Sequence, residues 1–214
     1  MKIGMTVAIE TDSIFAYYKD VEELACPAGF KLYLVKKNGH EIYVIQNGMG
    51  EIASAGGVQY LAAKYGVELI VNFGVVGGLT GEMKTKKVCV IDRVVHYKYD
   101  CSEFMDLAVG QVAGHDSVFL PTTAALVEKA LEVFPELKRA TCCSGDKFVG
   151  QESEKAALHD KFEGDVCDME SAGIVLTCEA NGVPCLLLTA ATLALAISAE
   201  RGSEAWLALI SAFS

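Results

Sequence analysis

The stretch VCDMESAG, residues 166–173, joins an apolar run to a helical run and carries two carboxylates at the junction. Asp168 and Glu170 flank Met169, and the helical run continues through residues 174–180. The first amides of a helix lack intrahelical partners and lie at the positive end of the helix dipole, so a carboxylate there stays ionised and held in place. Such a carboxylate beside a thioether suits a ligand with hydroxyl groups on one side and apolar atoms on the other. An acidic first turn that only caps the helix is the alternative interpretation.

Strands and helices alternate along the rest of the chain. Hydrophobic periodicity and turn residues predict strands at residues 2–9, 31–36, 41–46, 69–73, 88–91, 140–143 and 183–189. They predict helices at residues 51–65, 122–133, 154–162 and 203–212. This order predicts a single α/β domain over residues 1–214, with a mixed or mostly parallel sheet and helices on both faces. Ligands of such folds bind beyond the carboxyl ends of the strands.

The composition is that of a chain with a large apolar core and an acidic surface. The chain has 214 residues, of which 52% are hydrophobic, and a formal net charge of −10 at pH 7. The negative charge argues against nucleic acid as a partner, because phosphate contacts need clustered Lys and Arg. No apolar run reaches the roughly 18 residues that span a bilayer, so we expect no membrane association.

The eight cysteines form no C-x-x-C pair, and no metal-ligand spacing occurs in the chain. A zinc or redox site therefore has little support, and most of these thiols are expected to behave as small apolar side chains. The N-terminal segment lacks the features of a secretory signal, which favours a reducing cytoplasmic compartment.

Two glycine-rich segments follow predicted strands. Gly48, Gly50 and Ala53 match the spacing of a dinucleotide-binding fingerprint, but the next strand ends at residues 71–74 without the acid that would hold a ribose. We therefore expect no nucleotide cofactor and no other cofactor. The second segment, residues 74–78, is expected to form a loop whose backbone approaches a ligand or another strand. The two segments together predict a pocket with backbone walls.

Six short motifs occur in a characteristic order and spacing at residues 1–4 (MKIG), 10–12 (ETD), 47–50 (NGMG), 72–79 (NFGVVGGL), 144–149 (SGDKFV) and 168–172 (DMESA). Together they resemble the nucleoside phosphorylase and nucleosidase superfamily, most closely the 5′-methylthioadenosine/S-adenosylhomocysteine nucleosidases. The resemblance implies a three-layer α/β/α sandwich with a central mixed sheet and a homodimer. It also implies hydrolysis of the N-glycosidic bond of a purine nucleoside such as methylthioadenosine or S-adenosylhomocysteine, with release of adenine.

The resemblance also implies roles for individual residues. Asp12 falls where the family carries its catalytic glutamate and would activate water together with Glu10. Glu170 would accept hydrogen bonds from the ribose 2′ and 3′ hydroxyls while Met169 packs on the sugar. Cleavage leaves an oxocarbenium-like sugar that such carboxylates stabilise electrostatically. The remaining residues expected to contact the substrate are Phe148 and Val149, which would frame adenine, and Gly74, Val75, Val76 and Asp168.

One departure from the family bears on catalysis. The family's penultimate strand usually ends in Ser-Asp, and that Asp protonates the purine N7, but Thr192 and Leu193 occupy these positions here. Leucine cannot transfer a proton, and general acid catalysis typically contributes about 10²- to 10⁴-fold in rate. A nucleoside-binding homologue with impaired catalysis is therefore an alternative.

A phosphorylase is the other alternative. Phosphorylases of this superfamily bind phosphate with arginines, whereas Asn72 and Val75 stand in the glycine segment here and the nearest arginine, Arg93, is expected at the surface. These residues favour water as the nucleophile. Residues 150–152 (GQE) nevertheless resemble the base-recognition turn of uridine phosphorylases, although Ser153 replaces its companion arginine. A purine or pyrimidine nucleoside phosphorylase therefore remains an alternative function.

Overall fold

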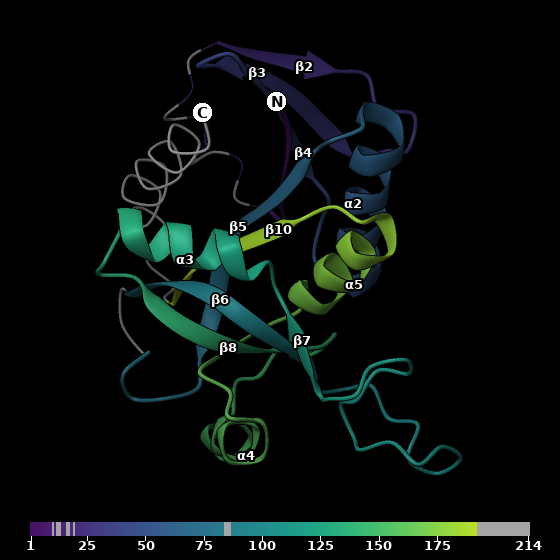
Figure 1. Cartoon of the computed structure of the whole chain (residues 1–214), viewed down its shortest axis with the longest axis vertical. Helices are drawn as coiled ribbons and strands as arrows, with labels where there is room; N and C mark the ends of the chain where they lie inside the picture. The colour runs from purple at the N-terminus through teal and green to yellow at the C-terminus, as the bar shows by residue number, and fades with distance from the viewer. Residues whose placement is uncertain (10, 12–13, 16–17, 19, 84–86, 192–214) are drawn as a thin grey trace.

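Helices cover both faces of a central sheet, as the alternation of elements predicted. In the computed structural model, α2 and α5 lie on one side of the sheet and α3 on the other, with α4 at one end (Figure 1). The structure describes residues 1–9, 11, 14–15, 18, 20–83 and 87–191. Within this part of the chain, no helix is long and apolar enough to cross a membrane.

The strands are β1 (Lys2–Val7), β2 (Val21–Leu24), β3 (Lys31–Lys37), β4 (His40–Gln46), β5 (Leu69–Gly78), β6 (Lys87–His96), β7 (Phe119–Pro121), β8 (Lys138–Ser144), β9 (Val166–Asp168) and β10 (Cys185–Ala191). The helices with complete bounds are α2 (Glu51–Tyr65), α3 (Ala124–Val133), α4 (Glu152–Phe162) and α5 (Ser171–Asn181).

The sheet is mixed, and part of it closes on itself. β1 pairs in parallel with β4 and β5, while β2 and β3 extend the β4 side as antiparallel strands. β10 pairs with both β5 and β6, and β9 pairs with both β8 and β5. With the β6–β8 pairing, these five strands form a closed ring. The predicted α/β class with a mixed sheet is therefore confirmed, and the ring is an added feature.

The central strands are apolar on both faces because each face is covered. Along β5, Leu69 and Val71 join the core under α3, whereas Ile70 joins the core under α2 and α5. In β10, Leu186 joins the core under α3 and Leu187 joins the core under α2 and α5. Successive side chains of a strand point to opposite faces, so a buried strand reads as a continuous apolar run.

Local signals predicted the β3–β4 hairpin and α2 closely. Asn38 and Gly39 form the hairpin turn with φ of 50° and 77°, the positive values that a two-residue turn of this kind requires. Helix α2 has the predicted bounds and ends at Gly66, whose left-handed backbone lets its amide bond the carbonyl of Ala62.

The prediction of a loop at residues 74–78 is wrong. β5 continues through Gly78, because β10 pairs with Gly74, Val75 and Val76 and β9 pairs with the two glycines that follow. Strand β6 is likewise longer than predicted and runs to His96. The helix predicted at residues 203–212 lies outside the described residues.

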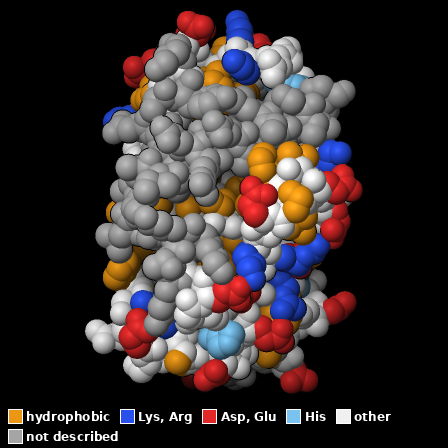
Figure 2. Space-filling model, turned by 90° about the vertical axis from the view of Figure 1, so that its left-hand side faces the viewer, with side chains coloured by type: hydrophobic (Ala, Val, Ile, Leu, Met, Phe, Trp, Pro, Cys, Tyr) orange, Lys and Arg blue, Asp and Glu red, His pale blue; other side chains and the backbone are white. Residues whose placement is uncertain are grey.

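All eight cysteines carry free thiols, and six of them are buried. Burial raises the pKa of Cys143 to about 12 and that of Cys167 to about 11. Both thiols therefore stay protonated at neutral pH and pack as small apolar groups, as predicted. On the face that Figure 2 shows, Lys and Arg side chains are interspersed with Asp and Glu among the described residues.

Candidate active site

The carboxylate of Glu170 is held by two backbone amides, one of which is distant in sequence. Its Oε1 accepts a hydrogen bond from Gly50 N at 2.8 Å, and its Oε2 accepts one from Met169 N at 3.2 Å. Gly50 is the residue before α2, and Glu170 is the residue before α5. The positive ends of two helices therefore meet at this carboxylate and favour its ionised form.

Gly50 can donate its amide to Glu170 because, without a side chain, it adopts a backbone conformation that other residues rarely adopt. Its φ of 99° is strained for other residues, and it supplies no side-chain cap to α2. The first amides of α2 are consequently left for acceptors from elsewhere in the fold. Ser54, buried in the first turn of α2, also binds the junction by donating its hydroxyl to the Glu170 carbonyl at 3.1 Å.

A close approach of α5 to α2 sets the spacing of these groups. A Cβ atom placed on Gly173 would lie 2.5 Å from the carbonyl oxygen of Glu51 and 2.7 Å from Ser54 Oγ. Only glycine allows this contact, which brings Glu170 and Gly50 together at the ends of the two helices.

Asp168 has a different set of partners. Its carboxylate accepts hydrogen bonds from the backbone amide and the hydroxyl of Ser171, in the first turn of α5. Burial raises the pKa of Asp168, and hydrogen bonds from Ser171 and Ser144 oppose that shift. The helix-capping interpretation therefore fits Asp168, whereas Glu170 reaches a second helix.

A second carboxylate binds the start of α2. Asp146 follows β8 in the loop and accepts a hydrogen bond from Glu51 N at 2.8 Å. Glu51 Oε1 also lies 2.8 Å from His96 Nε2, within ion-pair distance, although the geometry does not make a hydrogen bond. The ends of β6 and β8 are thus joined to the same helix terminus as Glu170.

The two residues predicted to frame the base point in different directions. Phe148 is 84% exposed on the loop between β8 and α4. Val149 is buried and belongs to the core cluster that contains Tyr97 and Leu158. The side chain of Phe148 is therefore free to cover a ligand, while Val149 anchors the loop that carries it.

The other predicted residues divide between the sheet and the part that the structure leaves undescribed. Gly74, Val75 and Val76 lie within β5. This strand pairs directly with β9, which leads to Met169. Glu10, Asp12 and Leu193 lie outside the described residues. The chain just before Glu10 runs beside the Gly48 turn, since Gly48 N donates to the carbonyl of Ala8 at 3.1 Å.

Two residues considered for phosphate binding are occupied otherwise. Asn72 is buried, and its Nδ2 donates to the carbonyl of Thr6 at 3.1 Å. Arg93 donates to Thr141 Oγ1, pairs with Glu163 at 2.6 Å and stacks on the ring of Phe119. Among the described residues, no group of three or more His, Cys, Asp or Glu could hold a metal ion.

A family model described as the phosphorylase superfamily matches residues 3–206, nearly the whole chain. This chain belongs to the phosphorylase superfamily. The superfamily resemblance read from the six motifs is therefore confirmed.

Relatives within the phosphorylase superfamily carry nucleosidase names. An aminodeoxyfutalosine nucleosidase of Campylobacter jejuni is 29% identical over 162 residues, which cover 74% of this chain and 70% of the relative. A 5′-methylthioadenosine/S-adenosylhomocysteine nucleosidase of Haemophilus ducreyi is 29% identical over 236 aligned positions, which cover 100% and 99%. The solved structure of a futalosine hydrolase mutant of Helicobacter pylori matches with a TM-score of 0.90 at 26% identity, covering 99% of both chains.

Sequence reasoning missed two members of this site, the Gly50 amide and Asp146. The glycine pattern at Gly48 and Gly50 was interpreted as a nucleotide fingerprint, as part of a pocket wall and as one of the six motifs, but not as a source of a specific hydrogen-bond donor. The sequence also indicates a helix start without a side-chain cap, because Gly50, the residue before the helix, has no side chain that could accept a hydrogen bond. Such a start predicts that acceptors come from elsewhere in the fold.

Proposed function

We propose that the chain is a nucleosidase that hydrolyses the N-glycosidic bond of a purine nucleoside carrying a 5′ substituent. The observation that carries the proposal is the Glu170 carboxylate, fixed by the amides of Gly50 and Met169 at the meeting point of two helices. A carboxylate held in this way can accept hydrogen bonds from vicinal ribose hydroxyls without reorganising. The nucleosidase names of the relatives support the same activity.

The proposed reaction breaks the bond between C1′ of the ribose and N9 of the base. Positive charge develops on the sugar, and Glu170 stabilises it through the ribose hydroxyls. A water molecule then attacks C1′, and its proton passes to Asp12, assisted by Glu10. Phe148 covers the base, and Met169 packs on the sugar. The adenine leaving group takes up one proton, so the products are adenine and the free 5′-modified ribose.

The surroundings of Asn72 and Arg93 support water over phosphate as the nucleophile. The Asn72 amide donates to the carbonyl and the hydroxyl of Thr6, and the guanidinium of Arg93 is already engaged by Thr141, Glu163 and Phe119. A phosphate dianion needs charge-assisted donors of the kind that Arg supplies.

Adenine release from methylthioadenosine is the test of this proposal. We expect the purified protein to release adenine at the same rate in phosphate-free buffer and in buffer with added phosphate, measured by chromatography. Release that requires phosphate would identify a phosphorylase instead, and loss of all activity in both buffers would refute the nucleosidase assignment. The rates of adenine release from S-adenosylhomocysteine and aminodeoxyfutalosine in the same assay show which 5′ substituent the protein prefers.

A nucleoside-binding homologue without efficient catalysis is the second candidate, favoured by Leu193 at the position of the family's acid. Such a protein would bind adenosine analogues in calorimetry without releasing base. Leu193→Asp would then raise turnover, because it restores a proton donor for the leaving group.

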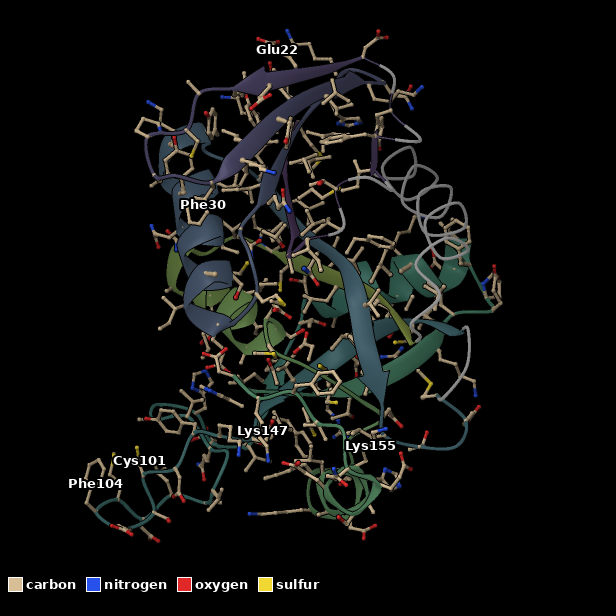
Figure 3. The ribbon with its side chains drawn as sticks, turned by 180° about the vertical axis from the view of Figure 1, so that it is seen from behind. Glu22, Phe30, Cys101, Phe104, Lys147 and Lys155 are labelled. Carbon is tan, nitrogen blue, oxygen red and sulfur yellow. The ribbon has the colours of Figure 1, made fainter. Side chains whose placement is uncertain are left out.

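We further propose that the protein acts as a homodimer in the cytoplasm, where its eight free thiols stay reduced. Exposed apolar side chains gather near the start of α2, where Ile52 is 85% exposed and Met49 is 66% exposed. The loop at residues 97–118 adds Phe104, which is 78% exposed and lies far from the body of the protein (Figure 3). Exposed apolar groups of this size are typical of protein–protein contacts.

Introducing positive charge at this surface tests the dimer. Ile52→Lys combined with Phe104→Lys is expected to convert the dimer to a monomer in sedimentation equilibrium, because a buried unpaired ammonium strongly disfavours the interface. Ala125→Lys is the matched control, since Ala125 is exposed on α3, on the other side of the sheet (Figure 1). A wild-type protein that sediments as a monomer would contradict the proposal.

A further inference from the structure

Two adjacent amides at the start of α2 bind two carboxylates from different parts of the chain. Gly50 N donates to Glu170, and Glu51 N donates to Asp146, each at 2.8 Å. Glu170 is 120 residues from Gly50 in sequence, and Asp146 is 95 residues from Glu51. The two N–H groups belong to consecutive peptide groups, which meet at the Cα atom of Gly50.

Asp146 contacts the Gly50–Glu51 backbone on more than one atom. A Cβ atom placed on Gly50 would lie 2.9 Å from Asp146 Oδ1, so the carboxylate packs directly against the Gly50 backbone as well as accepting the Glu51 amide. Rotation of the Gly50–Glu51 peptide would break the second contact. The Gly50 N–H belongs to the preceding peptide group, and it would turn away from Glu170 only if Gly50 itself shifted, a movement that no side chain of its own restricts. The contact of Asp146 with the Gly50 backbone opposes that shift.

Backbone contacts of Gly145, the residue before Asp146, fix the loop that carries Asp146. Gly145 N donates to the carbonyl of Asp168 at 3.1 Å, which joins the Asp146 loop to the strand that precedes Glu170. A Cβ atom on Gly145 would lie 2.9 Å from the ring of Tyr97, so this backbone fits closely against the end of β6. Asp146 is thus supported on one side by the Glu170 segment and on the other by Tyr97.

We infer that Asp146 is a positioning residue of the ribose site: it packs against Gly50 and binds the Glu51 amide, and this holds Gly50 where its N–H fixes the orientation of the Glu170 carboxylate. This inference rests on the proposed function, since it assigns to Asp146 a part in recognising the ribose hydroxyls. Asp146 has no direct contact with the substrate in this role. Its effect passes through the backbone of Gly50 to Glu170.

The test compares Asp146→Ala with Asp146→Asn on two substrates, methylthioadenosine and its 2′,3′-dideoxy analogue. Asp146→Ala is expected to lower kcat/KM for methylthioadenosine about tenfold, the effect of one charge-assisted hydrogen bond. Asp146→Asn keeps an oxygen that accepts the Glu51 amide and is expected to restore most of the activity. On the dideoxy analogue, which offers Glu170 no hydroxyl, the loss in Asp146→Ala is expected to fall below twofold.

The neighbouring Lys147 supplies the control. Its side chain is exposed and pairs with Glu154 of α4 (Figure 3), so Lys147→Ala is expected to leave both substrates within twofold of wild type. Equal losses on the two substrates in Asp146→Ala would overturn the inference, because a helix cap that only stabilises the fold would affect both alike. A wild-type protein without nucleosidase activity would overturn the proposed function and this inference together. Wild-type activity with an unchanged substrate ratio would overturn the inference alone.

Discussion

Glu170→Gln is expected to lower kcat/KM for methylthioadenosine by about 10²- to 10³-fold, the range found when a fixed electrostatic group is removed from a catalytic site. Both oxygens of the carboxylate accept backbone amides, Gly50 N on Oε1 and Met169 N on Oε2. A glutamine side chain has only one oxygen. Its NH₂ group would therefore face one of the two backbone N–H groups, and two donors cannot form a hydrogen bond with each other. The side chain then rotates or loses a hydrogen bond, and the negative charge opposite the developing cation is lost in either case.

The measurement is steady-state adenine release, with circular dichroism and thermal unfolding to establish that the variant is folded. Glu68→Gln is the matched control, because Glu68 Oε2 also accepts a distant backbone amide, Lys2 N at 2.7 Å, but at the opposite end of β1. We expect Glu68→Gln to retain wild-type turnover. A folded Glu170→Gln variant with unchanged kcat/KM would exclude Glu170 from the site.

Gly173→Ala is expected to destabilise the protein by about 3 kcal/mol and to reduce activity by about 10²-fold. The added methyl group would lie 2.5 Å from the Glu51 carbonyl oxygen, which is backbone in the first turn of α2 and cannot rotate away. Helices α2 and α5 must therefore separate. Separation moves Gly50 away from Glu170, so the ribose site changes together with the core.

Urea unfolding and adenine release measure the two effects in the same preparation. Gly81→Ala is the control, since a Cβ atom at Gly81 would meet nothing within 4 Å and its backbone φ is not in the left-handed region. We expect that variant to unfold and turn over within error of the wild type. If Gly173→Ala unfolded at the wild-type urea concentration, the close contact between the two helices would not exist in solution.

Local sequence predicted the elements whose signals lie within a few residues. The hairpin turn at Asn38 and Gly39 needs two residues with positive φ, and these two residues adopt it readily. The end of α2 at Gly66 depends in the same way on one glycine. Such elements form because of the conformational preferences of a few neighbouring residues, which the sequence shows directly.

Strand β5 was predicted only in part, because its second half is stabilised by partners distant in sequence. Gly74 and Gly77 have no β-propensity of their own and read as turn residues. Pairing with β10 and β9 makes the segment a strand, and a Cβ atom at Gly77 would lie 2.9 Å from Cys167 Sγ. Gly77 is therefore needed for the close approach of β9, and no local pattern identifies which strand approaches.

The sequence by itself determined that Asp168 and Glu170 stand at a strand-to-helix junction and that the sheet is apolar on both faces. The tertiary structure alone decided which of the two carboxylates caps the helix that follows it and which reaches a second helix. Asp168 binds the helix that follows it, while Glu170 binds Gly50, 120 residues away. The difference has a physical reason. A capping bond within one turn depends on local backbone geometry, whereas the Gly50 contact exists only because Gly173 lets α5 pack against the uncapped start of α2.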